Sequence, residues 1–302
     1  MAADAAVVVV AAADITGRRD RFGLGWRPEL AAGILTNRDR IDLIEIIAED
    51  HVDASRAGLR SLRRLAAQIP VVWHGLSLGL ASTVPVDTRR LDAFARLVGE
   101  TGAESWSEHL AFVRGGGVEI GHLAAPPRSP DSVDAACHNL ATARRIVGGA
   151  PLVENIASLI DPPASTIGEP EWAAAIVAGS GCFMLLDLHN LYANAVNFGE
   201  DPVAYLHRFP LERVGSVHLA GGRWIDGPNG ARRLLDDHLH DVPEPVFGLL
   251  TELGRLTSQP LTVVIERDGA YPPFADILRE LTAARQALAA GRAMRAGIAR
   301  AA

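Results

Sequence analysis

The sequence contains no lysine, so all 29 of its basic residues are arginines. Schiff-base chemistry on a lysine and a P-loop lysine are therefore excluded. Two cysteines, Cys137 and Cys182, are too few for a disulfide framework and indicate a reducing compartment. The net charge of −7 argues against nucleic acid or an anionic membrane surface as a partner.

Long apolar runs are also missing. The run "AAVVVVAAADI" at 5–15 is too short to span a bilayer. It follows the acidic Asp4, where a signal peptide would carry basic residues. We expect residues 1–19 to be a frayed leader, disordered or forming an extra strand, and the protein to be cytoplasmic.

Short β-rich apolar runs recur along the chain, and stretches with helical apolar spacing that end near glycine separate them. The predicted strands are 21–26, 42–49, 70–75, 105–112, 151–155, 182–190, 213–221 and 261–267. Eight strand–helix alternations with nearly continuous apolar strands predict a (β/α)8 TIM barrel, formed as one domain by residues 20–302. A doubly wound sheet is the alternative, but no GxGxxG follows an early strand.

Two connections are long. Residues 113–130 predict a hairpin turned by glycines, and residues 222–242 predict a longer loop after the seventh strand. Such loops usually build the mouth of a barrel. The arginine-spaced end, 284–302, predicts a solvated helix that caps the barrel, with a partner-docking helix as the alternative.

Seven of the eight predicted strands end in residue types that bind metals or transfer protons. These are Glu49, Asp50, His51, His74, Glu108, His109, Glu154, Asn155, Asp187, His189, Asn190, His218 and Glu266, and the loop after the seventh strand adds Asp236, Asp237 and His238. One such residue alone is more often a hydrogen-bonded histidine or a helix cap. In a barrel, however, the carboxyl ends of all strands meet on one face, where active sites are built.

Five carboxylates, from Glu49, Glu154, Asp187, Asp236 and Glu266, would surround this mouth. Like charges so close raise one another's pKa and destabilise the fold unless cations compensate. No lysine is available for this role, so bound metal ions are the natural counter-charge. Imidazole and carboxylate without thiolate suit iron, manganese or zinc. Asp236 and His238 could chelate one ion, whereas His122, His138 and His207 are expected to be structural.

The motifs "GLGWRPEL", "HGLSLGLAS", "SEHLAF", "LVENIAS", "LLDLHNLYANAVNFG", "VHLAGG", "DDHLHDVPEPV" and "VIERD" occur in this order. Over about residues 20–285 the chain thereby resembles the multinuclear non-haem iron-dependent oxidative enzymes, a family long described as a domain of unknown function that includes the methanobactin-biosynthesis oxidase. The fold of this family is a (β/α)8 barrel.

The resemblance implies a cluster of two or three iron ions of mixed valence, with O2 as co-substrate. The ligands that it implies are His74, His109, Glu154, Asp187, His218, Asp236, His238 and Glu266, with Glu154 as the bridging carboxylate. We assign the catalytic role to Glu154, Asp187 and His218. Six further residues are expected to support the ligands or to join them, namely Glu49, His51, Glu108, Asn155, His189 and Asn190.

The resemblance also implies a substrate and a partner. The substrate would be a ribosomally made precursor peptide, usually oxidised at cysteine, and a separate small protein would bind its leader. His51 and His189 depart from the family pattern and could alter the number of metals. Two alternatives from other classes are a zinc- or manganese-dependent hydrolase or isomerase, and a catalytically idle barrel that serves as a scaffold.

Overall fold

The computed structural model describes residues 19–227 and 230–301. The leader or extra strand predicted at residues 1–19 therefore lies, apart from Arg19, outside the described residues. Within the described part of the chain, no helix combines the length and the apolar character that crossing a membrane requires.

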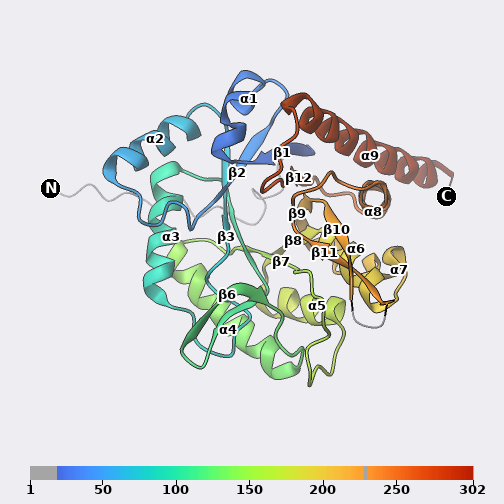
Figure 1. Cartoon of the computed structure of the whole chain (residues 1–302), viewed down its shortest axis with the longest axis horizontal. Helices are drawn as coiled ribbons and strands as arrows, with labels where there is room; N and C mark the ends of the chain where they lie inside the picture. Colours follow the sequence, from blue (N-terminus) through green and yellow to red (C-terminus); the bar gives the residue numbers. More distant parts are fainter. Residues whose placement is uncertain (1–18, 228–229, 302) are drawn as a thin grey trace.

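Eight parallel strands close into a barrel in the order β1–β12–β9–β8–β7–β4–β3–β2, with helices around it (Figure 1). This confirms the predicted fold. The strands are β1 (Arg21–Gly25), β2 (Leu43–Ile47), β3 (Val71–Gly75), β4 (Trp106–His109), β7 (Leu152–Glu154), β8 (Phe183–Asp187), β9 (Val214–Leu219) and β12 (Thr262–Ile265).

Some strands end earlier than predicted. The sixth was predicted to extend to residue 190, but β8 ends at Asp187 and α6 begins at Leu188. The side chain of Asp187 accepts a hydrogen bond from the backbone N–H of Asn190, which caps the helix directly at the end of the strand. The fourth was predicted to reach residue 112, but Phe112 already begins the next strand.

Helices fill the connections and surround the barrel (Figure 1). They are α1 (Ala31–Thr36), α2 (Arg56–Ala66), α3 (Thr88–Thr101), α4 (Pro130–Val147), α5 (Glu169–Ser180), α6 (Leu188–Phe198), α7 (Pro202–Leu206), α8 (Glu244–Leu256) and α9 (Phe274–Ala301), with short 3-10 turns at Pro28–Leu30 and Leu211–Arg213. The C-terminal helix α9 packs on α8 and on the outside of β1 and β12, so it covers the wall of the barrel.

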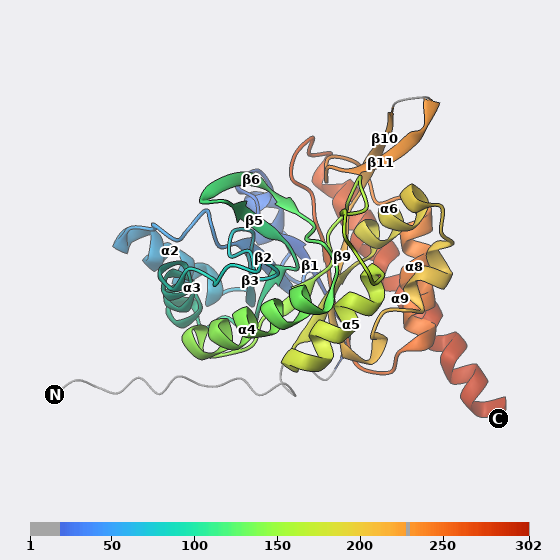
Figure 2. The same cartoon turned by 90° about the horizontal axis from the view of Figure 1, so that it is seen from below.

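Two antiparallel hairpins stand on the same side of the barrel (Figure 2). The predicted hairpin within 113–130 is confirmed as β5 (Phe112–Gly115) and β6 (Val118–Ala124). The stretch 222–242 was predicted as a loop, but it contains a second hairpin, β10 (Gly222–Asp226) and β11 (Arg232–Asp236). No strand was predicted there because the stretch has many charged and small residues and lacks the alternation of apolar and polar residues that indicates a strand.

The core has two parts, and they explain where polar side chains can gather. The larger cluster lies between the strands and the helices, and a small one is formed by Leu43, Val72 and Val264. Because side chains two apart on a strand share a face, Val72 places His74 on the inner side of the barrel. The strand register puts His109 beside Glu154, and Asp187 beside His218. The sheet thus brings polar side chains together inside the barrel, above an apolar layer.

Candidate metal centre

Two histidines approach one oxygen of Glu154. The Nε2 atom of His74 lies 3.4 Å, and that of His109 3.3 Å, from Oε2 of Glu154. The Nδ1 atom of His109 donates to the carbonyl of Gly75 at 3.0 Å, and Nδ1 of His74 lies 2.8 Å from the hydroxyl of Ser107. Since a carbonyl can only accept, Nδ1 of His109 carries a hydrogen, and Nε2, once it has lost its own proton, is the ring atom that could bind a metal ion.

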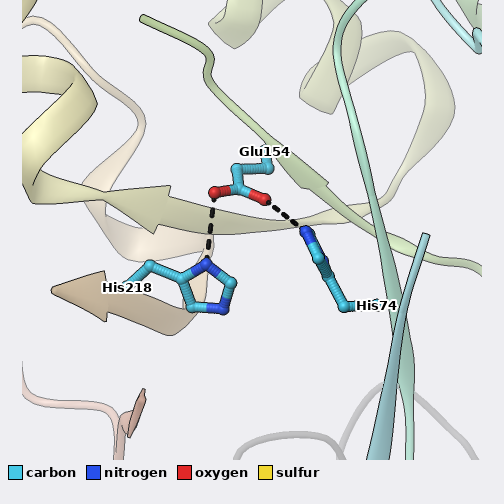
Figure 3. Close-up of side chains that lie close together, drawn as sticks. All are labelled: His74, Glu154 and His218. Carbon is cyan, nitrogen blue, oxygen red and sulfur yellow. Dashed lines mark ion pairs between the residues drawn. The ribbon is translucent and has the colours of Figure 1, made fainter. Parts of the chain in front are cut away.

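A third histidine approaches the other oxygen of Glu154 (Figure 3). The Nδ1 atom of His218 lies 3.2 Å from Oε1 of Glu154 and 3.0 Å from Oε2 of Glu266. Its Nε2 atom lies 2.9 Å from Oε1 of Glu45, deeper in the barrel. Glu154 therefore has the imidazoles of His74 and His109 at one carboxylate oxygen and that of His218 at the other, an arrangement that suits the predicted bridging role.

Asp187 both caps a helix and faces the other acids. Its Oδ1 atom accepts the N–H of Asn190 at 2.6 Å, while its Oδ2 atom is buried and has no hydrogen-bond partner among the described residues. One ligand atom each of Glu154, Asp187, His218 and Glu266 lies within 4.8 Å of the others. One oxygen of Asp187 thus caps the helix, and the other is left to face the site.

The second hairpin brings in a further pair. Asp236, the last residue of β11, places Oδ1 3.0 Å from Nε2 of His238 and 2.8 Å from Nδ1 of His189. His238 in turn lies 3.5 Å from Glu266, through its Nδ1 atom. The backbone of His238 has φ = 54°, in the left-handed region that residues other than glycine seldom adopt.

Gly222 lets the hairpin approach His189. A Cβ atom at this position would lie 2.6 Å from Cε1 of His189 and closer still to the carbonyl of Leu235. A larger residue would therefore push the base of the hairpin away from the histidine that contacts Asp236.

These contacts join all eight residues that were predicted as ligands. We call His74, His109, Glu154, Asp187, His218, Asp236, His238 and Glu266 the ligand cluster. Several of its buried atoms make no hydrogen bond within the described residues, including Oε2 of Glu154, Oδ2 of Asp187, both ring nitrogens of His218 and Nε2 of His238. Buried polar atoms are normally satisfied, and imidazole and carboxylate atoms that converge without partners fit divalent metal ions.

The charges in the ligand cluster perturb one another. Burial, together with the charges of Asp236 and Glu154, raises the pKa of Asp187 well above its usual value. Burial alone would lower the pKa of His109, but the negative charges of Glu154 and Glu108 raise it to about 9. Burial and the neighbouring His109 and His218 hold the pKa of His74 well below its usual value. Such opposite shifts among close groups are typical of functional sites.

The six residues expected beside the ligands separate into two groups. Asn155, Asn190 and His189 lie within the site. Asn155 exchanges two hydrogen bonds with the backbone of Asp187, at 2.9 and 3.0 Å. The side-chain amide of Asn190 donates to the carbonyl of Asn155 at 3.1 Å. These bonds hold the ends of β7 and β8 together and thereby orient Glu154 and Asp187.

Of the other three, Glu49 and Glu108 hold neighbouring backbone, and His51 packs against an aromatic ring. Glu49 accepts the N–H of Leu76 at 2.9 Å, and Glu108 accepts the N–H of Leu78 at 3.0 Å. The ring of His51 packs edge-on against Trp73, with centroids 5.8 Å apart. Trp73 bonds to Thr101 on the outer helix α3, so this contact lies outside the barrel. We therefore leave Glu49, Glu108 and His51 out of the candidate ligand set.

Glu45 is a site residue that the strand-end pattern missed. It lies in the middle of β2, is 2% exposed, and contacts His218. Burial raises its pKa above the usual value. The signal that could have found it is an acidic residue within the otherwise apolar run "LIEII", because a buried charge in a strand must have a partner.

A cavity of about 890 Å³ opens above the ligand cluster. Its inner side is lined by five members of the ligand cluster, namely His74, His109, Asp236, His238 and Glu266. Its opposite wall is apolar and includes Phe112 and Leu123 of the first hairpin and Ile156, Leu159 and Ile160 of the loop after β7. Leu159 and Ile160 are 40% and 68% exposed, so they offer apolar surface at the cavity.

Comparison with known proteins gives a family match over most of the chain. Residues 21–289 match the model of a family described as "RiPP precursor modification enzyme MbnB/TglH/ChrH", where RiPP denotes a ribosomally synthesised and post-translationally modified peptide. A UPF0276 protein of Caulobacter vibrioides is 33% identical over 278 residues, which cover 90% of this chain and 96% of that protein. A UPF0276 protein of Streptomyces avermitilis is 38% identical over 88% of this chain, but the match spans only 54% of that longer protein.

Solved structures resemble the fold at low sequence identity. An L-ribulose 3-epimerase has a TM-score of 0.59 and 15% identity, with 92% of this chain and 98% of that chain covered. A D-tagatose 3-epimerase-like protein has a TM-score of 0.57 and 16% identity, with 92% and 99% covered. At such identities the similarity shows a shared barrel and nothing about the reaction.

Proposed function

The chain belongs to the family of RiPP precursor modification enzymes MbnB/TglH/ChrH, and from this premise we propose that it is an iron- and O2-dependent oxidase that modifies cysteine residues of a ribosomally synthesised precursor peptide. The observation that carries the proposal is the ligand cluster, in which Glu154 stands between imidazoles on both of its oxygens. Its donors are all imidazole or carboxylate, a set that suits redox iron.

The proposed ligands fall into three adjoining groups. His74 and His109 share Oε2 of Glu154, whereas His218 lies at Oε1 and forms a second group with Asp187 and Glu266. Asp236 and His238 form the third group, which is joined to the second through Glu266. Iron ions held there would supply the electron transfer to O2 that the oxidation of a peptide side chain requires. Two or three ions are compatible with these groups.

The protein itself contributes orientation and exclusion of water. Gly75 and Ser107 fix the rings of His109 and His74, and Glu45 contacts the outer nitrogen of His218. Partners of this kind orient the ligands of a metal ion and tune their basicity. The apolar wall of the cavity would hold the peptide beside the ligand cluster and reduce the access of water.

We also propose that a separate small protein binds the leader of the precursor and delivers it. The barrel and its two hairpins account for the region that matches the family, residues 21–289.

Cys137 and Cys182 are free in the structure, which is compatible with a reducing cytoplasm.

The test is anaerobic reconstitution with Fe(II), followed by addition of O2, the cognate precursor peptide and the partner protein. We expect about two to three iron ions per chain, a change in the mass of the peptide, and loss of that change when its cysteine is replaced by serine. Glu154→Ala should remain folded by circular dichroism and lose iron. Tight binding of zinc with less than about one iron per chain would favour the hydrolase class instead. An unchanged peptide mass with an intact iron cluster would contradict the oxidase.

A further inference from the structure

Three asparagines on α6 lie on one face of the helix, at spacings of four and three residues, and all are buried. They are Asn190, Asn194 and Asn197, with exposed fractions of 4%, 1% and 4%. Residues at such spacings stack above one another along a helix. A buried polar stripe of this kind must find partners, and each of these side chains bonds to the backbone of a segment far away in the sequence.

Asn194 holds the loop after β7. Its amide nitrogen donates to the carbonyl of Ile156 at 2.9 Å, and its amide oxygen accepts the N–H of Ser158 at 2.8 Å. The same nitrogen donates to Oε2 of Glu169 at 2.7 Å, and this buried acid also accepts a hydrogen bond from the hydroxyl of Tyr205 at 2.7 Å. The loop so held begins two residues after Glu154 and continues into the apolar wall of the cavity.

Asn197 holds the second hairpin in the same way. Its nitrogen donates to the carbonyl of Leu234 at 2.9 Å, and its oxygen accepts the N–H of Leu234 at 2.7 Å. The side chain thus pairs with β11 as a neighbouring strand would. Leu234 is two residues before Asp236, the member of the ligand cluster that the hairpin carries.

We infer that Asn194 and Asn197 are positioning residues. Through them, α6 holds the loop after β7 and the hairpin β10–β11 close to the end of β8. Asn197 places Asp236 against His238, and Asn194 places the apolar wall of the cavity. The helix begins at Leu188 and is capped by Asp187, itself in the ligand cluster, so one rigid element relates three parts of the site. The inference rests on the proposed metal site only for the role of Asp236.

The chain offers a matched control in Asn139 on α4. This asparagine is 2% exposed, accepts the N–H of Val86 at 3.0 Å, and donates to the carbonyls of Leu80, Ser82 and Val84 at 2.9–3.2 Å. It therefore clamps backbone as Asn194 and Asn197 do, but the segment that it holds carries no member of the ligand cluster.

The experiment compares Asn194→Ala, Asn197→Ala and Asn139→Ala by hydrogen–deuterium exchange of the metal-free protein and by Co(II) titration. We expect Asn197→Ala to raise exchange at least tenfold in peptides covering 230–236 but not in 155–160, and Asn194→Ala to do the reverse. Asn197→Ala should bind one Co(II) at least tenfold more weakly, whereas Asn194→Ala and Asn139→Ala should bind Co(II) within about twofold of the wild type.

If Asn197→Ala does not fold, Asn197→Asp is used, because it keeps the acceptor for the N–H of Leu234 and replaces the donor by an oxygen that faces the carbonyl of Leu234. It should raise exchange over the same residues and leave 155–160 unchanged. Exchange that rises over the whole chain in every variant, as after any loss of stability, would overturn the inference. If the wild type binds no Co(II) or Fe(II), the proposed function fails, while the exchange pattern still decides whether the two asparagines act as clamps.

Discussion

Glu45 lies 2.9 Å from Nε2 of His218, on the side of the ring opposite to the other acids. The pair is completely enclosed in the barrel, with exposed fractions of 2% for Glu45 and 0% for His218. A carboxylate in this place faces the outer nitrogen of the imidazole and can increase the basicity of the ring, while the inner nitrogen faces Glu154 and Glu266.

Glu45→Gln should therefore weaken metal binding without unfolding the barrel. An amide can still contact the ring, but it no longer increases the basicity of the imidazole. We expect affinity for the ion nearest His218 to fall by about 10–100-fold. Anaerobic titration with Fe(II) or Co(II) measures the effect. Glu49→Gln is the control, because Glu49 bonds to the backbone of Leu76, and it should leave the affinity unchanged. Equal losses in both variants would show that any buried acid at this end affects the site in the same way.

The two oxygens of Asp187 can be separated by mutation. Asparagine is as good a helix cap as aspartate, so Asp187→Asn should keep the bond to Asn190 but lose the ligand oxygen. Burial and neighbouring acids raise the pKa of Asp187, and the metal-free variant should therefore be no less stable than the wild type. We expect it to lose about one metal ion per chain. Asp187→Ala should lose the ion and, in addition, about 1 kcal/mol of stability.

Asp201 provides the comparison for this experiment. It caps α7 through the N–H of Ala204 at 2.8 Å and lies outside the ligand cluster. Asp201→Ala should lower the thermal midpoint without changing the metal content. The interpretation of Asp187 as a ligand would be wrong if Asp187→Asn kept its full complement of metal ions.

The sequence predicted the barrel because apolar strands and amphipathic helices alternate along the whole chain. It also predicted where polar side chains would meet, since parallel strands in a barrel end on one face. His74, His109, Glu154 and His218 come together for this reason alone, through the register of neighbouring strands. Their role as metal ligands rests on the resemblance to the family and on their chemistry, and stays a prediction.

What the sequence did not reveal depends on side-chain direction and on tertiary contacts. Glu49, His51 and Glu108 were predicted to lie near strand ends. This position alone does not indicate whether a side chain points into the barrel or away from it. Glu45 was missed because it lies in the middle of β2, two residues before the strand ends. The roles of Asn194 and Asn197 depend on loops that are far away in the sequence, and no local pattern indicates them.

Metal binding should release protons and weaken as the pH falls. The pKa of His109 is raised to about 9 by the acids around it, despite its burial. At pH 7.5 this imidazole therefore carries a proton that a metal ion must displace. The affinity for the metal ion should increase as the pH rises toward about 9 and decrease as the pH is lowered from there. Co(II) calorimetry in buffers of different ionisation enthalpy measures the release. His109→Ala should release fewer protons, and an affinity that did not change between pH 7 and 8.5 would contradict this account.

The apolar wall of the cavity should determine how tightly the peptide is held. Leu159 and Ile160 are largely exposed in the free protein and lie across the cavity from the ligand cluster. Covering one such side chain with an apolar residue of the peptide would contribute about 1 kcal/mol, or about a fivefold change in KM. We expect Ile160→Ser to raise KM by about this factor while kcat and the metal content stay the same, because Ile160 lies outside the ligand cluster. Val84→Ser, which alters another aliphatic side chain that is 53% exposed but does not line the cavity, should leave KM unchanged. A fall in kcat with unchanged KM would mean that the wall acts on the chemistry, and equal effects of the two variants would mean that the peptide lies elsewhere.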